Sequence, residues 1–180
     1  MSNFEFIAVL LSIIFALAIA NLLSGMLQAF LKGDLTDTRL AWSILVGNIL
    51  LLDWWVFFGW NDHTDWRFHE FLYLAVWATF HYVMAVSLYP YQFLTEYSEN
   101  LQRKSVLTSL LVLGVLDMGE KIVRGDILEP WYYPLMILYI MTFAAAPLVF
   151  DRPWVMRVSG WVLAVSLLTW SVIVRGVLAV

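Results

Sequence analysis

The chain has 180 residues, of which 62% are hydrophobic and only 13% are charged, and its formal net charge is −4. This balance excludes an ordinary soluble domain and indicates a membrane protein. The absence of cysteine excludes disulfides, thiolate metal ligands and cysteine nucleophiles. The few Lys and Arg residues are scattered, so we expect no binding to nucleic acid.

Apolar residues fall into six blocks, each close to the roughly 20 residues that a helix needs to cross the hydrocarbon core of a membrane. The polar connections between the blocks are too short to form a soluble domain. We therefore expect an all-α fold with a single integral membrane domain over residues 1–180, built as a bundle of six transmembrane helices. The expected spans are Phe4 to Leu31, Leu40 to Trp60, Phe68 to Phe93, Ser105 to Gly125, Trp131 to Phe150 and Trp154 to Arg175.

The first span is much longer than the apolar part of a cleaved signal peptide and has no basic segment before it, so we expect a retained helix. It carries Ala16, Ala20 and Ser24 at intervals of four, with Asn21 and Gly25 on the adjacent stripe. Small residues at this spacing let helices approach closely in lipid. The stripe predicts tight packing inside the bundle, with a dimer face as the alternative.

The second span contains a single acidic residue, Asp53, in the stretch LLDWWVFFGW. On the fourth span, one face carries a charged stripe at i, i+3, i+4 and i+7, formed by Asp117, Glu120, Lys121 and Arg124. At about 1.5 Å per residue, Asp53 and Asp117 both lie about 10 to 12 Å from one membrane surface. We expect Asp53 to face the stripe and to reach Lys121, because an unpaired carboxylate at this depth is strongly destabilising.

The third span carries His81. By the same rise per residue, His81 and Asn48 lie deeper, about 18 to 20 Å from that surface, and Asn21 lies further in. This deeper polar layer allows two interpretations. One is a proton relay that passes from the two aspartates through His81 to Asn21, because histidine titrates near neutrality. The other is a structural histidine whose hydrogen bond is satisfied by Asn48.

We expect no metal site, no cofactor and no catalysis. The three histidines, His63, His69 and His81, have no recognised metal-ligand spacing. His69 and His81 lie about 18 Å apart along one helix and cannot both bind one haem. The GxSxG, HExxH and Walker patterns are missing from the sequence.

Basic residues near the ends of the spans predict the orientation, because they are enriched on the cytoplasmic side. The ends joined by the first, third and fifth connections carry Lys32, Arg39, Arg103, Lys104, Arg152 and Arg157. The opposite ends carry Arg67, Arg124 and Arg175, with Lys121 somewhat within its span. We therefore expect the odd-numbered connections in the cytoplasm and both termini on the periplasmic side.

Three stretches also carry a resemblance: FEFIAVLLSIIFALAIANLLSG in the first span, a WW pair in the second, and the acidic helix end DMGEKIVRGD in the fourth. Together they resemble a loose group of uncharacterised small bacterial polytopic inner-membrane proteins. A neutral residue usually precedes the aromatic pair in that group, so Asp53 is a departure from the pattern. The resemblance implies a bacterial inner-membrane setting and carries no mechanism.

For function we expect a non-enzymatic inner-membrane protein that contacts the lipid bilayer and associates with itself, as a homo-oligomer, or with larger membrane partners as an accessory subunit. In this case the charged residues form an interhelical polar clamp. The alternative is an ion or proton channel or transporter in which they line a vestibule, using Asp53, His81, Asp117, Glu120 and Lys121. A membrane enzyme acting on a lipid or a quinone is a third hypothesis, without a nucleophile or metal set to support it.

Overall fold

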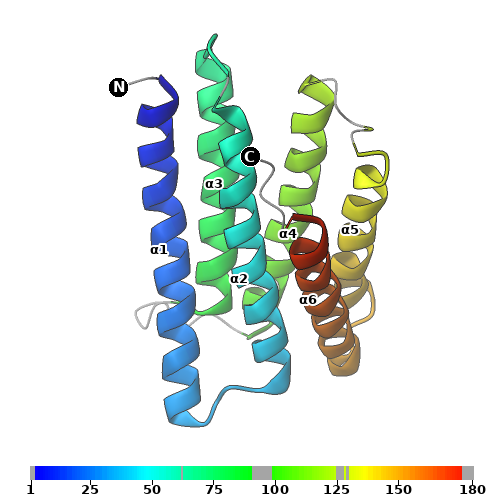
Figure 1. Cartoon of the computed structure of the whole chain (residues 1–180). Helices are drawn as coiled ribbons and strands as arrows, with labels where there is room; N and C mark the ends of the chain where they lie inside the picture. The colour runs from blue at the N-terminus through cyan, green and yellow to red at the C-terminus, as the bar shows by residue number, and fades with distance from the viewer. Residues whose placement is uncertain (1–2, 62, 91–98, 125–127, 129, 176–180) are drawn as a thin grey trace.

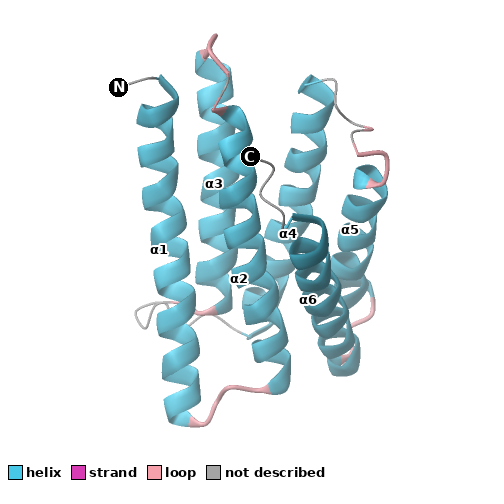
Figure 2. Cartoon of the chain, in the orientation of Figure 1, coloured by secondary structure: helices cyan, strands magenta, loops and turns pink. Residues whose placement is uncertain are grey.

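The computed structural model describes residues 3–61, 63–90, 99–124, 128 and 130–175, without the side chains at 99, 120, 123, 124, 174 and 175. Over these residues the chain forms six α-helices, one short 3₁₀-helix and no strand (Figure 2). The elements in chain order are α1 (Asn3–Lys32), α2 (Asp37–Phe57), η1 (Phe58–Trp60), α3 (Phe68–Leu88), α4 (Glu99–Arg124), α5 (Tyr133–Val149) and α6 (Pro153–Arg175).

The expected all-α fold with six helices is confirmed, and the helix bounds shift where local chemistry starts or stops a helix. The second helix begins at Asp37, before Leu40, because the side chain of Thr36 caps it by accepting a hydrogen bond of 3.2 Å from the Arg39 amide. The third helix ends at Leu88, because Tyr89 precedes a proline and leaves the helical conformation. The rest of the expected third span, residues 91–93, lies outside the described residues.

Other helix ends use the same local signals. Gly33, with a φ of +72°, ends α1, and the amide of Asp34 bonds back to Ala29 O at 2.8 Å. The carboxylate of Glu70 accepts a hydrogen bond of 2.8 Å from the amide of Arg67 at the start of α3. Pro153 occupies the first position of α6, where its missing N–H costs nothing.

The six helices run in alternating directions and form a closed ring (Figure 1). In spatial order the neighbours around the ring are α1, α3, α4, α5, α6, α2 and again α1, and α2 also contacts α3 across it. We call one end of the bundle, where α2 ends and α3 begins, the α2–α3 end. The opposite end, where α1 ends and α2 begins, is the α1–α2 end. An even number of alternating helices returns the chain to the end of the bundle where it began. The first residue of α1 and the last residue of α6 therefore both lie at the α2–α3 end.

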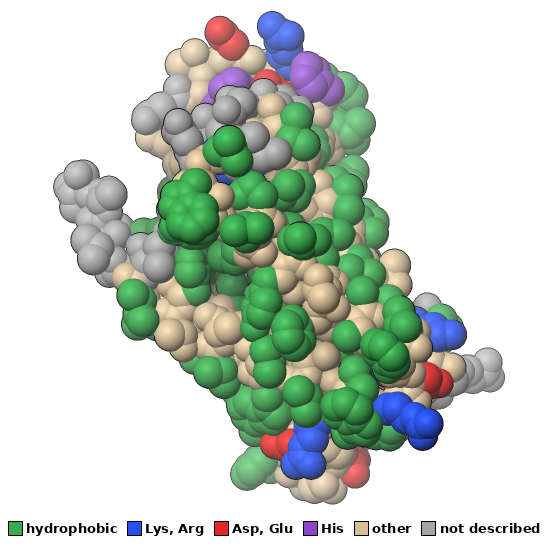
Figure 3. Space-filling view, turned by 90° about the vertical axis from the view of Figure 1, so that its right-hand side faces the viewer, with side chains coloured by type: hydrophobic (Ala, Val, Ile, Leu, Met, Phe, Trp, Pro, Cys, Tyr) green, Lys and Arg blue, Asp and Glu red, His purple; other side chains and the backbone are tan. Residues whose placement is uncertain are grey.

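The outer surface of the bundle is apolar. Large side chains such as Phe6, Leu17, Leu27 and Val172 are between 53% and 66% exposed, more than an aqueous surface of this extent normally tolerates. On the face drawn in Figure 3, hydrophobic side chains cover the middle of the molecule, and charged side chains gather toward its two ends. This distribution is the one expected of a lipid-facing surface.

Four helical segments are long and apolar enough to cross a membrane: Asn3–Lys32, Asp37–Trp60, Phe68–Leu88 and Pro153–Ile173. The fourth and fifth expected spans differ from them. Helix α4 extends six residues before its expected start at Ser105 and has charged residues at both ends, which lower its mean hydropathy. Helix α5 has 17 residues, about 25 Å at 1.5 Å per residue, which is shorter than a typical hydrocarbon core of about 30 Å.

Candidate functional site

A cavity of about 100 Å³ lies inside the ring, toward the α2–α3 end. Five helices, all except α1, contribute side chains to it. Its polar side chains are Asp53, Tyr73, Asp117, Lys121 and Tyr133, together with the indoles of Trp60, Trp77 and Trp170. Three of the candidate residues, Asp53, Asp117 and Lys121, therefore meet at one cavity although they come from two helices far apart in the sequence.

A short polar contact at the cavity joins Asp53 to His81. Asp53 Oδ2 lies 2.6 Å from His81 Nε2. The side chain of His81 is fully buried and that of Asp53 is 18% exposed. The imidazole packs between two aromatic rings, with centroid distances of 5.0 Å to Phe15 and 4.6 Å to Trp77. The pair is thus enclosed by apolar groups on the histidine side and open to the cavity on the aspartate side.

The hydrogen bonds of His81 determine where its protons are. Its Nδ1 lies 2.9 Å from the carbonyl oxygen of Trp77, and a carbonyl can only accept, so Nδ1 carries a hydrogen. In the neutral ring Nε2 would then present a lone pair to the Asp53 carboxylate. A contact of 2.6 Å between two acceptors is repulsive, so a second proton must lie between Nε2 and Oδ2. The Asp53–His81 pair therefore holds one dissociable proton and is neutral as a unit.

A second carboxylate is joined to this pair through Trp77. The indole Nε1 of Trp77 donates a hydrogen bond of 2.9 Å to Asp117 Oδ1, while the backbone carbonyl of the same residue holds His81. Tyr73, one turn earlier on α3, donates a hydrogen bond of 2.7 Å to the carbonyl of Leu116. Helix α3 thus contacts both acidic groups, Asp53 of α2 through His81 and Asp117 of α4 through Trp77.

Lys121 lies at the side of the cavity nearer the α2–α3 end. Its Nζ lies 5.4 Å from the ring centroid of Tyr133, which is a cation–π contact between α4 and the start of α5. Asp53 bonds to His81 and not to Lys121, so the expected partner of Asp53 was wrong. The side chains of Glu120 and Arg124, the other two members of the charged stripe, lie outside the described residues.

His81 lies in the same layer as Asp53 and not in a deeper one, so its expected depth was wrong. Counting residues along each span places His81 several ångströms deeper than Asp53, because it assumes that the end of the second span and the start of the third lie at the same level. Figure 1 shows instead that α3 starts beyond the end of α2, which brings His81 level with Asp53. Relative axial shift between helices depends on packing, so counting residues along each span does not reveal it.

Asn48 and Asn21 have other partners. Asn48 accepts a hydrogen bond of 3.1 Å from Ser171 on α6, so the expected bond between Asn48 and His81 was wrong. Asn21 donates to the carbonyl oxygens of Ala85 and Tyr89, at 3.3 and 3.2 Å, and thereby holds α1 against the end of α3. Both amides join neighbouring helices, and neither hydrogen-bonds to the Asp53–His81 pair.

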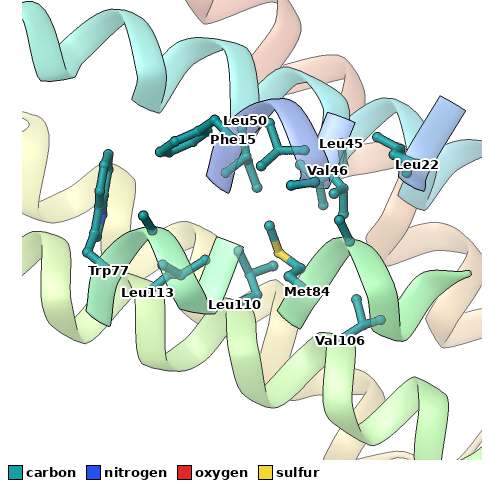
Figure 4. Packing of buried hydrophobic residues seen from close by; sticks show 14 of the residues in the cluster. Phe15, Leu22, Leu45, Val46, Leu50, Trp77, Met84, Val106, Leu110 and Leu113 are labelled. Atoms are coloured by element: carbon teal, nitrogen blue, oxygen red, sulfur yellow. The ribbon is translucent and has the colours of Figure 1, made fainter. Parts of the chain in front are cut away.

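A dry layer separates the cavity from the α1–α2 end. Ile49 and Leu110 form the floor of the cavity, and Val46, Met84 and Leu107, which lie beyond them toward the α1–α2 end, have no exposed surface. In Figure 4, apolar side chains from α1 and α2 face those from α3 and α4 at this level. The expected line of polar groups from Asp53 to Asn21 is therefore interrupted, and the cavity is closed toward the α1–α2 end.

The stripe of small residues on α1 lies elsewhere than we expected. Ala16, Ala20 and Ser24 are exposed on the outside of the bundle, and α1 packs inward through larger residues such as Phe15 and Leu22. Gly25 alone among the small residues makes a close approach, because a Cβ there would lie 2.2 Å from Tyr89 Cγ. The expectation of packing inside the bundle does not hold for the other three.

No group of three or more His, Cys, Asp or Glu side chains that could hold a metal ion occurs within the described residues. His63 instead contacts Glu70 at 3.2 Å, beside the stacked indoles of Trp60 and Trp66. Comparison with protein-family models, with curated proteins and with solved structures finds no match to this chain.

Sequence reasoning missed the role of Trp77. The signal was present, since Trp77 lies four residues before His81 and so one turn away on the same helix face. The fact that its indole reaches a carboxylate 40 residues later in the chain follows only from the packing of α3 on α4.

Proposed function

We propose that this protein carries protons in the membrane through the Asp53–His81 pair. The observation that supports this proposal is the 2.6 Å contact between Asp53 Oδ2 and His81 Nε2, which requires a shared, dissociable proton at the wall of an internal cavity. Ionisable side chains inside membrane spans are costly, and apolar residues of similar size could pack the same space. Their presence next to a cavity favours a functional role over a purely structural one.

The size of the cavity supports a small species. A cavity of about 100 Å³ has room for several water molecules. Pockets for drug-sized ligands are larger, about 300–1,000 Å³. The cavity is therefore suited to water, protons or a small ion, and it is too small for the head group of a lipid or a quinone.

The closed floor of the cavity supports a carrier over an open channel. A proton on the pair can exchange with water at the α2–α3 end, whereas the layer of Val46, Met84 and Leu107 excludes water toward the α1–α2 end. Transfer across the membrane then requires that the helices rearrange and open this layer. Such one-sided access is the arrangement of a carrier in one of its two states.

Proton flux into reconstituted vesicles tests the proposal. The purified protein is incorporated into liposomes that contain a pH-sensitive dye, and a potassium diffusion potential is imposed with valinomycin. We expect wild-type vesicles to change internal pH faster than protein-free vesicles, and Asp53→Asn vesicles to fall to the protein-free rate, because the amide cannot take up the shared proton. A wild-type rate equal to that of protein-free vesicles would contradict the proposal.

Asp34→Asn is the matched control. It makes the same chemical change at an exposed position of the α1–α2 end, outside the cavity. We expect its flux to equal that of the wild type. Equal flux in Asp53→Asn and Asp34→Asn would also overturn the proposal.

A second candidate function is association within the membrane, as a homo-oligomer or as an accessory subunit of a larger complex. The exposed stripe of Ala16, Ala20 and Ser24 favours it, because small residues on a lipid-facing surface allow another helix to approach closely. The native mass of the protein extracted in a mild detergent tests this candidate. A monomer without co-purifying polypeptides would exclude it.

The proposed setting is a bacterial inner membrane with all six helices spanning it. The basic residues near the α1–α2 end support a cytoplasmic position for that end. Both termini and the open side of the cavity would then be periplasmic, and the carrier would take up its proton from that side.

A further inference from the structure

We infer that the cavity binds a small protonated amine in exchange for the proton of the Asp53–His81 pair. This inference rests on the proposed function, because it names the ion that exchanges with the carried proton. It is supported by the charge balance of the cavity, the aromatic residues of its wall and its volume.

The charges of the described side chains at the cavity sum to zero only while the Asp53–His81 pair holds its proton. With its shared proton the Asp53–His81 pair is neutral, and the carboxylate of Asp117 is balanced by the ammonium of Lys121. Loss of the proton leaves a net charge of −1 inside the bundle. Such an uncompensated charge is strongly unfavourable in a membrane. Entry of one monovalent cation therefore compensates the charge that release of the proton leaves in the cavity.

The titratable groups that face the pair are few. Helix α2 contributes Asp53, α3 contributes Tyr73, and α4 contributes Asp117 and Lys121. Helix α5 contributes Tyr133, and the residues of α6 at the cavity, Leu167 and Trp170, carry no charge. Phe15 is the residue of α1 that contacts the imidazole.

The wall of the cavity favours an organic ammonium ion over a metal cation. Six aromatic residues line it: Phe57, Trp60, Tyr73, Trp77, Tyr133 and Trp170. Aromatic faces attract ammonium groups through cation–π interactions, and Lys121 already makes such a contact with Tyr133. Calcium requires six to eight oxygen ligands and magnesium a near-ideal octahedron, which two carboxylates in an aromatic wall do not supply.

The geometry also provides a position for the ammonium group. Asp53 bonds to His81 through Oδ2, and within the described part of the chain its Oδ1 has no hydrogen-bond partner. An ammonium N–H can therefore donate to Oδ1 while the alkyl group lies against the aromatic wall. The cavity is smaller than the roughly 150 Å³ that holds benzene, which limits the ligand to amines with a few carbon atoms.

The exchange breaks no bond within the amine. The amine enters as R–NH₃⁺ from the α2–α3 end, and its N–H groups donate to the Asp53 carboxylate. The proton between Oδ2 and Nε2 leaves to water on the same side, and His81 keeps the hydrogen on Nδ1. The Asp53 carboxylate then turns from Nε2 toward the ammonium group, because two acceptors at 2.6 Å repel each other. One positive charge enters and one leaves, so the net charge of the cavity stays at zero.

Isothermal titration calorimetry with methylammonium chloride tests the inference on the full chain in detergent. The titration is run in two buffers of different ionisation enthalpy, so that the difference in heat counts the protons released. We expect saturable binding, release of up to one proton per bound amine, and no binding of tetraethylammonium, which exceeds the cavity. Sodium chloride at equal concentration should not compete, because sodium gains little from the aromatic wall.

Three variants make the test specific. Asp53→Asn should weaken binding about ten- to hundredfold, as expected for loss of a hydrogen bond to a charged group. Trp77→Phe keeps an aromatic face but removes the indole hydrogen bond to Asp117, and it should reduce affinity while retaining proton release. Asp34→Asn should bind as the wild type does, and circular dichroism should show that all three variants keep their helices.

Absence of saturable heat in the wild type, or equal affinity in Asp53→Asn, would overturn the inference. Equal heats in the two buffers would exclude exchange, because no proton is then released. Failure of the inference can be distinguished from failure of the proposed function. Proton flux without methylammonium binding would support the proposed proton carrier and contradict the amine site. Methylammonium binding without proton flux would contradict the proposed carrier.

Discussion

His81 meets an acceptor on each side of its ring, the carbonyl of Trp77 at 2.9 Å and the carboxylate of Asp53 at 2.6 Å. Each ring nitrogen must carry a hydrogen to donate to its acceptor, so the imidazole needs two hydrogens. A neutral imidazole carries only one of them. The other is held jointly by the histidine and the aspartate. A proton held in this way at the wall of a cavity can be lost and regained without a change in the fold, which is the property that a carrier needs.

The Asp53–His81 contact should be measurable as a coupling energy. We expect Asp53→Asn and His81→Gln to interact by about 1 to 3 kcal/mol in a double-mutant cycle, because the two groups share a charge-assisted hydrogen bond in a largely apolar site. The free energy of unfolding of each variant is measured in mixed micelles with increasing dodecyl sulfate.

The control cycle pairs His81→Gln with Asp34→Asn, which lies at the other end of the bundle and shares no partner with His81. Its two effects should add within about 0.5 kcal/mol. If the Asp53 and His81 effects add equally well, the two side chains do not share a proton.

Among the helices, α3 has the central place. It packs on α1 and α4 and crosses to α2, and residues at successive turns, Tyr73, Trp77 and His81, connect it to the cavity. Near its end, α3 approaches α1 so closely that only glycine fits at position 25. Residues of α1 and α3 at the α1–α2 end therefore fix the position of α3, and through it the position of the histidine.

Gly25→Ala should destabilise the α1–α3 contact by about 1 to 3 kcal/mol. The new Cβ would lie 2.2 Å from Cγ and 2.3 Å from Cβ of Tyr89, and these atoms are too near the backbone to move aside alone. Unfolding in mixed micelles measures the effect. Ser24→Ala, on the exposed neighbouring face, should change stability by less than about 0.5 kcal/mol. Equal stability of the two variants would show that α1 does not approach α3 this closely.

At the scale of the whole molecule, the ring of helices separates an apolar exterior from the polar cavity at Asp53. Ion pairs at the α1–α2 end add contacts between elements: Arg157 with Asp37, and Arg103 with Asp151 at 2.6 Å. Asp37 and Asp151 are 42% and 75% exposed, and such surface pairs contribute at most about 1 kcal/mol. The arrangement of the helices is therefore set mainly by apolar packing.

Single cysteines can determine whether α4 crosses the membrane, because the chain has no native cysteine. Thr64 and Leu128 are exposed at the α2–α3 end, and Asp34 is exposed at the opposite end. We expect Thr64→Cys and Leu128→Cys to react with an impermeant maleimide from the same side of the membrane, and Asp34→Cys only from the other. Labelling of Thr64→Cys and Leu128→Cys from opposite sides would show that one of α3 and α4 does not cross.

Much of the fold follows from the sequence, because helix formation in an apolar chain is governed by local patterns. The six blocks, the cap at Thr36 and the proline after Tyr89 are readable without the structure. Hydropathy also selected Asp53, His81, Asp117 and Lys121 as exceptions within apolar spans. The partners of these residues were not predictable, since they depend on how far each helix is shifted and rotated against its neighbours.

The sequence by itself determined that the chain is all-helical, that most of its helices are apolar enough for a membrane, and which ionisable residues interrupt them. Only the tertiary structure decided that Asp53 bonds to His81, that Trp77 connects Asp117 to the same histidine, and that a dry layer closes the cavity on one side. The physical reason is the separation along the chain over which each kind of interaction acts. Hydropathy and helix caps act over one or a few turns, whereas a hydrogen bond between helices depends on the packing of residues 28 to 40 positions apart.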